Sequence, residues 1–76
     1  MKDKADFTVN KLLSRLEPAQ LVNIIDPELK PEDRTLFSNK AAKFRDHADE
    51  LGERVVKIIG SSVSAAGRVY ILVYVY

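Results

Sequence analysis

Cysteine is absent from the 76 residues of this chain, and histidine occurs once, as His47. Without cysteine the chain can form no disulfide, no thiolate nucleophile and no cysteine-ligated zinc site. A single histidine supplies too few ligands for a zinc or copper site. The sequence also contains neither a Gly-x-Ser-x-Gly nucleophile elbow nor the Gly-Lys-Ser/Thr end of a phosphate loop. We therefore expect no metal, no cofactor and no enzymatic activity.

The chain also has no excess of either charge. Its 12 lysine and arginine residues are balanced by 11 aspartate and glutamate residues, which leaves a net charge of +1. Proteins dedicated to a polyanion usually carry a strong basic excess, so the totals do not favour a nucleic-acid partner. The lack of cysteine fits a reducing compartment, and the first six residues hold no apolar signal core. We therefore expect a cytoplasmic protein.

Long hydrophobic runs are missing as well. The uninterrupted apolar run that follows Arg68 has only eight residues, whereas a membrane-spanning helix needs about 20. A membrane partner is thus not expected, and a membrane-associated protein with an apolar C-terminal segment is the second alternative function. The length predicts a single small domain, residues 1–76. Because the chain ends inside an apolar segment, the sequence leaves open whether Tyr76 is the natural C-terminus.

The most informative segment that is present covers residues 68–76, which is rich in β-branched and aromatic residues and predicts a strand. Alternation along a strand places four residues on each face. One face carries Val69, Ile71, Val73 and Val75, and the other carries Tyr70, Leu72, Tyr74 and Tyr76. An apolar strand of this kind has to be covered. We predict that the face with the three tyrosines contacts a partner or a second copy of the chain.

Helical spacing dominates the first half of the chain. Residues 7–16 predict an amphipathic helix with Asp6 or Thr8 as its cap, and Pro18 opens a second short helix that reaches Ile25. Asp26 and Pro27 then predict a tight turn. From Pro31 onward, apolar residues recur with spacings of four and three, which indicates one long helix with a heptad seam. The seam consists of Phe37, Ala41, Phe44, Ala48, Leu51, Val55 and Ile58.

The end of this long helix is ambiguous. Gly52 is typical of a residue just past a helix end, and residues 53–59 would then form a strand that pairs with residues 68–76 across a loop of residues 60–67. The continued seam at Val55 and Ile58 favours a longer helix instead. We predict an α+β fold in which small N-terminal helices and one long amphipathic helix pack on a C-terminal β-hairpin. The alternative is a mostly α fold with a single C-terminal strand.

Charged residues on the expected long helix suggest two kinds of contact. Arg34, Lys40, Lys43 and Arg45 form a basic segment, residues 34–45, that could meet phosphates, so a small DNA- or RNA-binding regulator is the first alternative function. The seam is also flanked by basic residues, which disfavours pairing of this helix with a second copy of itself and suggests an acidic protein partner. The pair Glu50 and Arg54 has the spacing of a surface ion pair on a helix.

A two-stranded sheet is marginally stable alone, and its unpaired edge tends to recruit another strand. A chain of this length also buries a limited core, roughly 60–65% of its unfolded surface. We therefore predict a non-enzymatic protein–protein interaction or assembly module that forms a homo-oligomer, with a dimer as the expected state, through its C-terminal strand.

Overall fold

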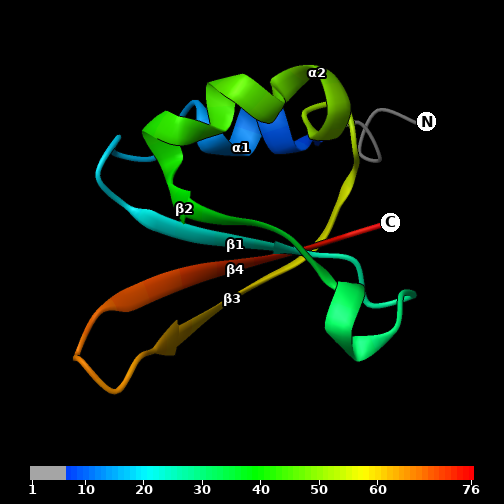
Figure 1. Ribbon diagram of the computed structural model, residues 1–76. Coiled ribbons are helices and arrows are strands. Elements are labelled where there is room, and N and C mark those ends of the chain that lie inside the picture. The colour runs from blue at the N-terminus through cyan, green and yellow to red at the C-terminus, as the bar shows by residue number, and fades with distance from the viewer. Residues whose placement is uncertain (1–6) are drawn as a thin grey trace.

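The computed structural model describes residues 7–76, and a four-stranded mixed sheet lies at its centre, with the strand order β2-β1-β4-β3. The strands are β1 (Leu21–Ile25), β2 (Thr35–Lys40), β3 (Val56–Val63) and β4 (Val69–Val75). β1 pairs with β2 in antiparallel fashion, β4 pairs with β3 in the same way, and β1 and β4 run parallel side by side (Figure 1). The sheet therefore consists of two antiparallel pairs joined along a parallel seam.

Short helical segments cover one face of this sheet. They are α1 (Val9–Leu13), the 3₁₀ helix η3 (Ala41–His47) and α2 (Ala48–Leu51), and Figure 1 shows all three on the same side. A further 3₁₀ turn, η2 (Pro31–Asp33), lies in the connection between β1 and β2. The core forms between the helices and the sheet, from Val9, Leu12, Leu13, Val22, Ile24, Phe37, Phe44, Val73 and Val75.

The first helix forms where it is expected but is shorter. Thr8 caps α1, because its Oγ1 accepts a hydrogen bond from the Lys11 N–H at 3.3 Å. The helix ends at Leu13, and Leu16 is only half-buried beyond it. Asp6, the other expected cap, lies outside the described residues.

The second predicted helix, residues 18–25, is wrong, because residues 21–25 form β1. Burial along β1 alternates with a period of two, which buries Val22 and Ile24 and leaves Leu21 and Ile25 half-buried on the other face. This is the pattern of a strand with two different faces rather than that of a helix. β-branched residues fit such a surface well.

The predicted long helix is also wrong, and its seam is divided among several elements. Phe37 lies in β2, the segment from Ala41 to Leu51 forms η3 and α2, and Ile58 lies in β3. The spacing of three and four is helical only within residues 41–51. Phe37 and Phe44 still meet in the core, with ring centroids 5.3 Å apart and nearly perpendicular planes. The predicted architecture of a long helix on a hairpin is therefore incorrect, and so is the mostly α alternative.

Gly52 closes α2 at the position expected for a helix end, but not for the expected reason. Its φ of −64° is right-handed, so no left-handed turn requires glycine here. A Cβ at this position would instead collide with the carbonyl oxygen of Ala48 and with the side-chain amide of Asn10. The Asn10 N–H also donates to the Gly52 carbonyl at 3.0 Å. Glycine is needed because α1 approaches closely.

The two C-terminal segments pair as a hairpin, with bounds that differ from those expected. β3 extends to Val63, so the loop is short, and Gly67 adopts a φ of 81° at its end. The Gly67 N–H donates to the Ser64 carbonyl at 2.9 Å, and the Ser64 N–H donates to the Arg68 carbonyl at 2.8 Å. This is a three-residue hairpin loop that ends in a glycine bulge.

β4 is an interior strand, flanked by β1 and β3. Its backbone is paired on both sides, so the strand edge expected at the C-terminal strand belongs to β3 instead. The start of the β3 edge is occupied, because the Val56 N–H donates to the Phe7 carbonyl at 2.9 Å and Thr8 bridges Val55. Within residues 7–76, β2 and β3 are the outer strands of the sheet. The same residues contain no helix with the length and apolar character needed to cross a bilayer.

Candidate interaction surface

The sheet face opposite α1, η3 and α2 carries most of the residues predicted to contact a partner. Cross-strand pairing aligns Leu21 with Tyr70, Asn23 with Leu72 and Ile25 with Tyr74. On the other side of β4, Ile58 lies opposite Tyr74. We call this surface the open face, and its residues are Leu21, Asn23, Ile25, Ile58, Tyr70, Leu72 and Tyr74.

The three predicted residues on β4 are half-buried by their neighbours on the open face. Tyr76, the fourth, follows β4 and is exposed, with the Lys57 Nζ atom 5.4 Å from its ring centroid. Tyrosine suits such a partly wet surface because it combines an apolar ring with a polar hydroxyl. The structure thus brings Tyr70, Leu72 and Tyr74 together on one face, as the sequence predicts, and places Tyr76 at its end.

Exposed apolar side chains concentrate on the β3–β4 hairpin. Among the described residues six large hydrophobic side chains are exposed, and five of them are Ile58, Ile59, Val63, Val69 and Tyr76. The sixth, Leu29, lies in the connection after β1. Ile58, Ile59 and Val63 on β3 are 58%, 48% and 66% exposed. Such a concentration of apolar surface on one hairpin is typical of an interaction site.

The direction of the β3 backbone groups follows from the hairpin loop. Ser64 and Arg68 form a hydrogen-bonded pair, and such pairs alternate with non-bonded pairs along an antiparallel ladder. The N–H and C=O groups of Ser62 and Gly60 therefore face β4, and those of Val63, Ser61 and Ile59 face away from it.

A hydrogen bond from the Gln20 side chain gives the same assignment of which β3 backbone groups face outward. The Val69 carbonyl, opposite Val63, accepts a hydrogen bond from the Gln20 Nε2 atom at 3.1 Å. Gln20 immediately precedes β1, so this carbonyl points toward β1 and away from β3. Val63 and Val69 are therefore a non-bonded pair. Ile59, Ser61 and Val63 consequently present their backbone groups at the outer edge of the sheet.

One end of the opposite edge, on β2, has its outward donor already bonded. The Ala41 N–H donates to the Gln20 carbonyl, which by the same alternation turns the Lys40 N–H outward. The Asn39 Oδ1 atom accepts a hydrogen bond from this N–H at 2.7 Å. The β1–β2 ladder also contains an irregularity between Ile24 and Ile25. A charged side chain and a bulge are features that disfavour edge pairing in natural sheets.

The four predicted nucleic-acid contacts do not gather into one patch. Arg34 precedes β2 and Lys40 ends it, so about 20 Å of strand separates them. The Arg34 Nε atom donates to the Leu29 carbonyl at 2.8 Å, which holds this guanidinium against its own loop. Lys43 and Arg45 are exposed on η3. The basic rim used to infer an acidic partner also requires a continuous helix, and residues 34–58 do not form one.

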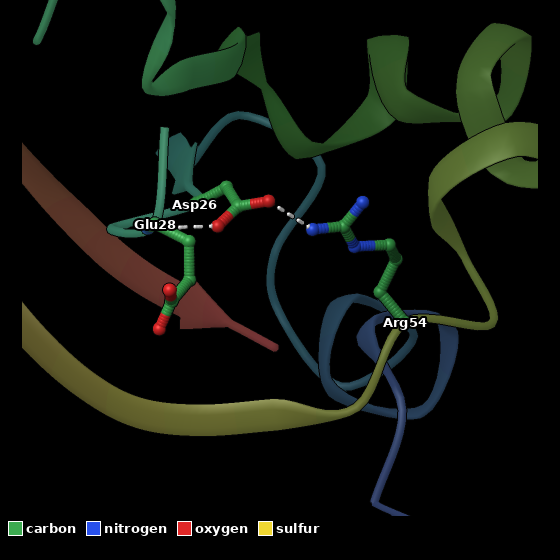
Figure 2. Close-up of polar contacts among 3 residues, drawn as sticks. All are labelled: Asp26, Glu28 and Arg54. Atoms are coloured by element: carbon green, nitrogen blue, oxygen red, sulfur yellow. Dashed lines mark hydrogen bonds and ion pairs between the residues drawn. The ribbon is translucent and has the colours of Figure 1, made fainter. Parts of the chain in front are cut away.

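One ion pair joins distant parts of the chain, and the spacing rules did not predict it. Arg54 does not pair with Glu50, because α2 ends at Leu51 and helical spacing no longer applies. Instead its Nη2 atom lies 2.5 Å from the Asp26 Oδ2 atom (Figure 2). Asp26 follows β1 and Arg54 precedes β3. The pair therefore ties the end of the central strand to the segment that leads into the hairpin.

Asp26 also caps the turn that the sequence predicts at this position. Its Oδ1 atom accepts a hydrogen bond from the Glu28 N–H at 3.0 Å (Figure 2). The Glu28 N–H and, after it, the Arg54 guanidinium hold the pKa of the Asp26 carboxyl below its ordinary value. Both contacts favour the ionised form. Both Asp26 oxygens are bonded to groups of the chain itself, so these contacts connect two segments of the fold.

Other candidate chemistry in the described residues is limited. The His47 ring is half-buried against Phe37, with centroids 5.2 Å apart. Residues 7–76 contain no group of three or more acidic or histidine side chains placed to hold a metal ion. No pocket is found in the described part of the chain. Comparison with known proteins gives no matching protein family, no matching curated protein and no matching solved structure.

Proposed function

We propose that this chain is a non-enzymatic interaction module that assembles with copies of itself through its C-terminal hairpin. The observation that carries the proposal is the concentration of exposed apolar side chains on β3, on β4 and at Tyr76. Ile58 on the open face and Ile59 and Val63 on the opposite face leave apolar surface exposed along an outer strand, and covering this surface is favourable.

The occupant we propose is a second copy of the chain. β3 carries no charge between Ile58 and Val63, so no electrostatic feature on this surface selects a partner of opposite sign. The domain is also small, and a small domain gains a larger share of its buried surface from association than a large one does. The open face, with Tyr70, Leu72 and Tyr74, lies beside the hairpin edge and adds apolar surface to the same region.

The experiment that tests the proposal is the measurement of solution mass by light scattering across a dilution series. We expect a mass above that of the monomer at high micromolar concentration, with dissociation on dilution. The melting temperature should rise with protein concentration, because association stabilises the folded state by mass action. A monomer mass at every concentration, together with a constant melting temperature, would contradict the proposal.

A further inference from the structure

The β3 edge has the features of a self-complementary interface, and the proposal developed from it rests on the proposed self-association. Its outward backbone groups come from Ile59, Ser61 and Val63, two residues apart from one another. No proline or charged residue lies between Ile58 and Val63. The edge of β2, in contrast, carries Lys40 with its N–H already bonded to Asn39. The outward groups of Ile59, Ser61 and Val63 have no partner among residues 7–76, beyond the point where the Val56 N–H donates to the Phe7 carbonyl.

We propose that two copies pair through β3 in antiparallel fashion about a two-fold axis at Ser61. Only outward-facing residues can form hydrogen-bonded pairs across such a junction. An axis at Ser61 joins Ser61 to its counterpart, Ile59 to the second copy's Val63, and Val63 to the second copy's Ile59. This register pairs all three outward residues with one another, whereas a shift by one pair places Ile59 opposite Ala65 of the loop or Val63 opposite Lys57, next to the irregularity of β3.

The side chains at this junction are compatible with the register. Ile59 and Val63 point to the same sheet face and are 48% and 66% exposed in the single chain. The two-fold axis places Ile59 of one copy directly opposite Val63 of the other, so each pair buries apolar surface that water now contacts. Cross-strand pairs of β-branched residues of this kind stabilise sheets.

Charge and shape allow the same arrangement. Lys57, the nearest charged residue on β3, would lie opposite the hairpin turn of the second copy, far from the second copy's Lys57. Two like charges are therefore not brought together. Figure 1 shows the β3–β4 hairpin extending away from α1, η3 and α2, so the helices of one copy leave the edge open. The product is one continuous sheet with strand order β2-β1-β4-β3-β3-β4-β1-β2, and its two open faces lie side by side.

Two variants test the role of the β3 edge. Ser61→Pro removes an outward N–H, and proline is tolerated at such a position of an outer strand. Ile59→Lys places a charge on the edge, which is a common natural means of preventing edge pairing. Ser61→Ala keeps the N–H and is the matched control. We expect Ser61→Ala to associate like the original chain, and both test variants to weaken association by about tenfold or more.

Hydrogen exchange provides a direct readout of the register. The amides of Ile59, Ser61 and Val63 should exchange rapidly in dilute protein and slow by about tenfold or more at high concentration. The amides of Gly60 and Ser62 face β4 and should be protected at both concentrations. If Ser61→Pro fails to fold, the exchange pattern and Ile59→Lys decide the question.

The outcomes separate this proposal from the proposed function. If the original chain associates, but both variants associate equally well and the three outward amides stay unprotected, the β3 register is wrong and self-association stands. If the original chain is monomeric at all concentrations, both proposals fail. Association lost in both variants, with far-ultraviolet circular dichroism unchanged, supports the register at Ser61.

Discussion

Replacement of Phe44 by alanine is the sharpest test of the core between the helices and the sheet. Phe44 is only 4% exposed, and its ring meets Phe37 edge to face with centroids 5.3 Å apart. Phe37 belongs to β2 and Phe44 to η3, so this contact holds the helical segment on the sheet. Removing a buried phenylalanine side chain typically costs about 3–5 kcal/mol, which includes the cavity that it leaves.

This cost is large for a chain of this length. At roughly 0.05–0.15 kcal/mol per residue, the whole domain has a free energy of unfolding of about 4–11 kcal/mol. Phe44→Ala should therefore lower the melting temperature by about 12 °C or more, since each kcal/mol shifts a small domain by about 4–8 °C. Urea unfolding followed by circular dichroism measures the free energy directly, at a protein concentration held constant.

Two neighbouring positions serve as controls. Lys43 is exposed on the same 3₁₀ helix, and Lys43→Ala should change the free energy of unfolding by no more than about 0.5 kcal/mol. Leu51 is only half-buried, so Leu51→Ala should cost clearly less than Phe44→Ala. A melting temperature that Phe44→Ala leaves unchanged would refute the packing described here. Equal costs for Phe44→Ala and Leu51→Ala would instead support one continuous helical seam.

Three further predictions concern single contacts. Gly52→Ala should destabilise the fold by about 1–3 kcal/mol in urea unfolding, because its Cβ would collide with Asn10 and with a backbone carbonyl; an unchanged midpoint would show that α1 does not pack this closely. Gly67→Ala should cost about 1–2 kcal/mol through its positive φ alone, since no atom lies near the added methyl group, and Gly67→Asn should cost less, an order that thermal unfolding can check. Because the pKa of Asp26 is lowered in the folded state, its stabilising effect is present above the ordinary aspartate value of about 3.9 and is lost as the pH falls through the lowered value. Asp26→Asn should remove that part of the pH dependence, and identical stability profiles against pH for the two proteins would contradict the assignment.

Local signals in the sequence were sufficient for several features of the fold. The Thr8 cap and the turn at Asp26 depend on residues within a few positions of each other. The alternation of residues 68–76 also sorts the side chains of β4 correctly, with Val73 and Val75 in the core and Tyr70 and Tyr74 on the opposite face. These features could be predicted because no distant part of the chain decides them.

Local signals alone could not show that the predicted long helix is wrong. A spacing of three and four identifies residues that share an apolar environment, and Phe37, Phe44 and Leu51 do belong to the core or pack against it. The spacing does not show that one helix connects them. Here Phe37 reaches the core as an inward residue of β2 and Phe44 as an inward residue of η3. The periodicity predicted members of the core but not the elements that carry them.

β1 shows why short apolar runs are ambiguous. Five residues that include Val22, Ile24 and Ile25 satisfy a helical and a strand pattern almost equally well. The choice is made by the parallel partner, β4, whose Tyr70 aligns with Leu21 from the other end of the chain. A contact of such large sequence separation leaves no trace in the local pattern. Without β1 as a strand, β4 had only one neighbour and was placed at the edge of the sheet.

The role of residues 58–63 depends on the position of β3 as an outer strand of the sheet. An uncharged, proline-free run that contains Ile58, Ile59 and Val63 is unremarkable in an interior strand, where both neighbours use its backbone groups. At the outer edge of a sheet the same run leaves alternate donors and acceptors without a partner among residues 7–76, beside exposed apolar side chains. On the β2 edge the outward donor of Lys40 is already bonded to Asn39. If two copies pair through β3 as proposed, β2 forms both outer edges of the eight-stranded sheet, so β3-to-β3 pairing by itself would add no third copy.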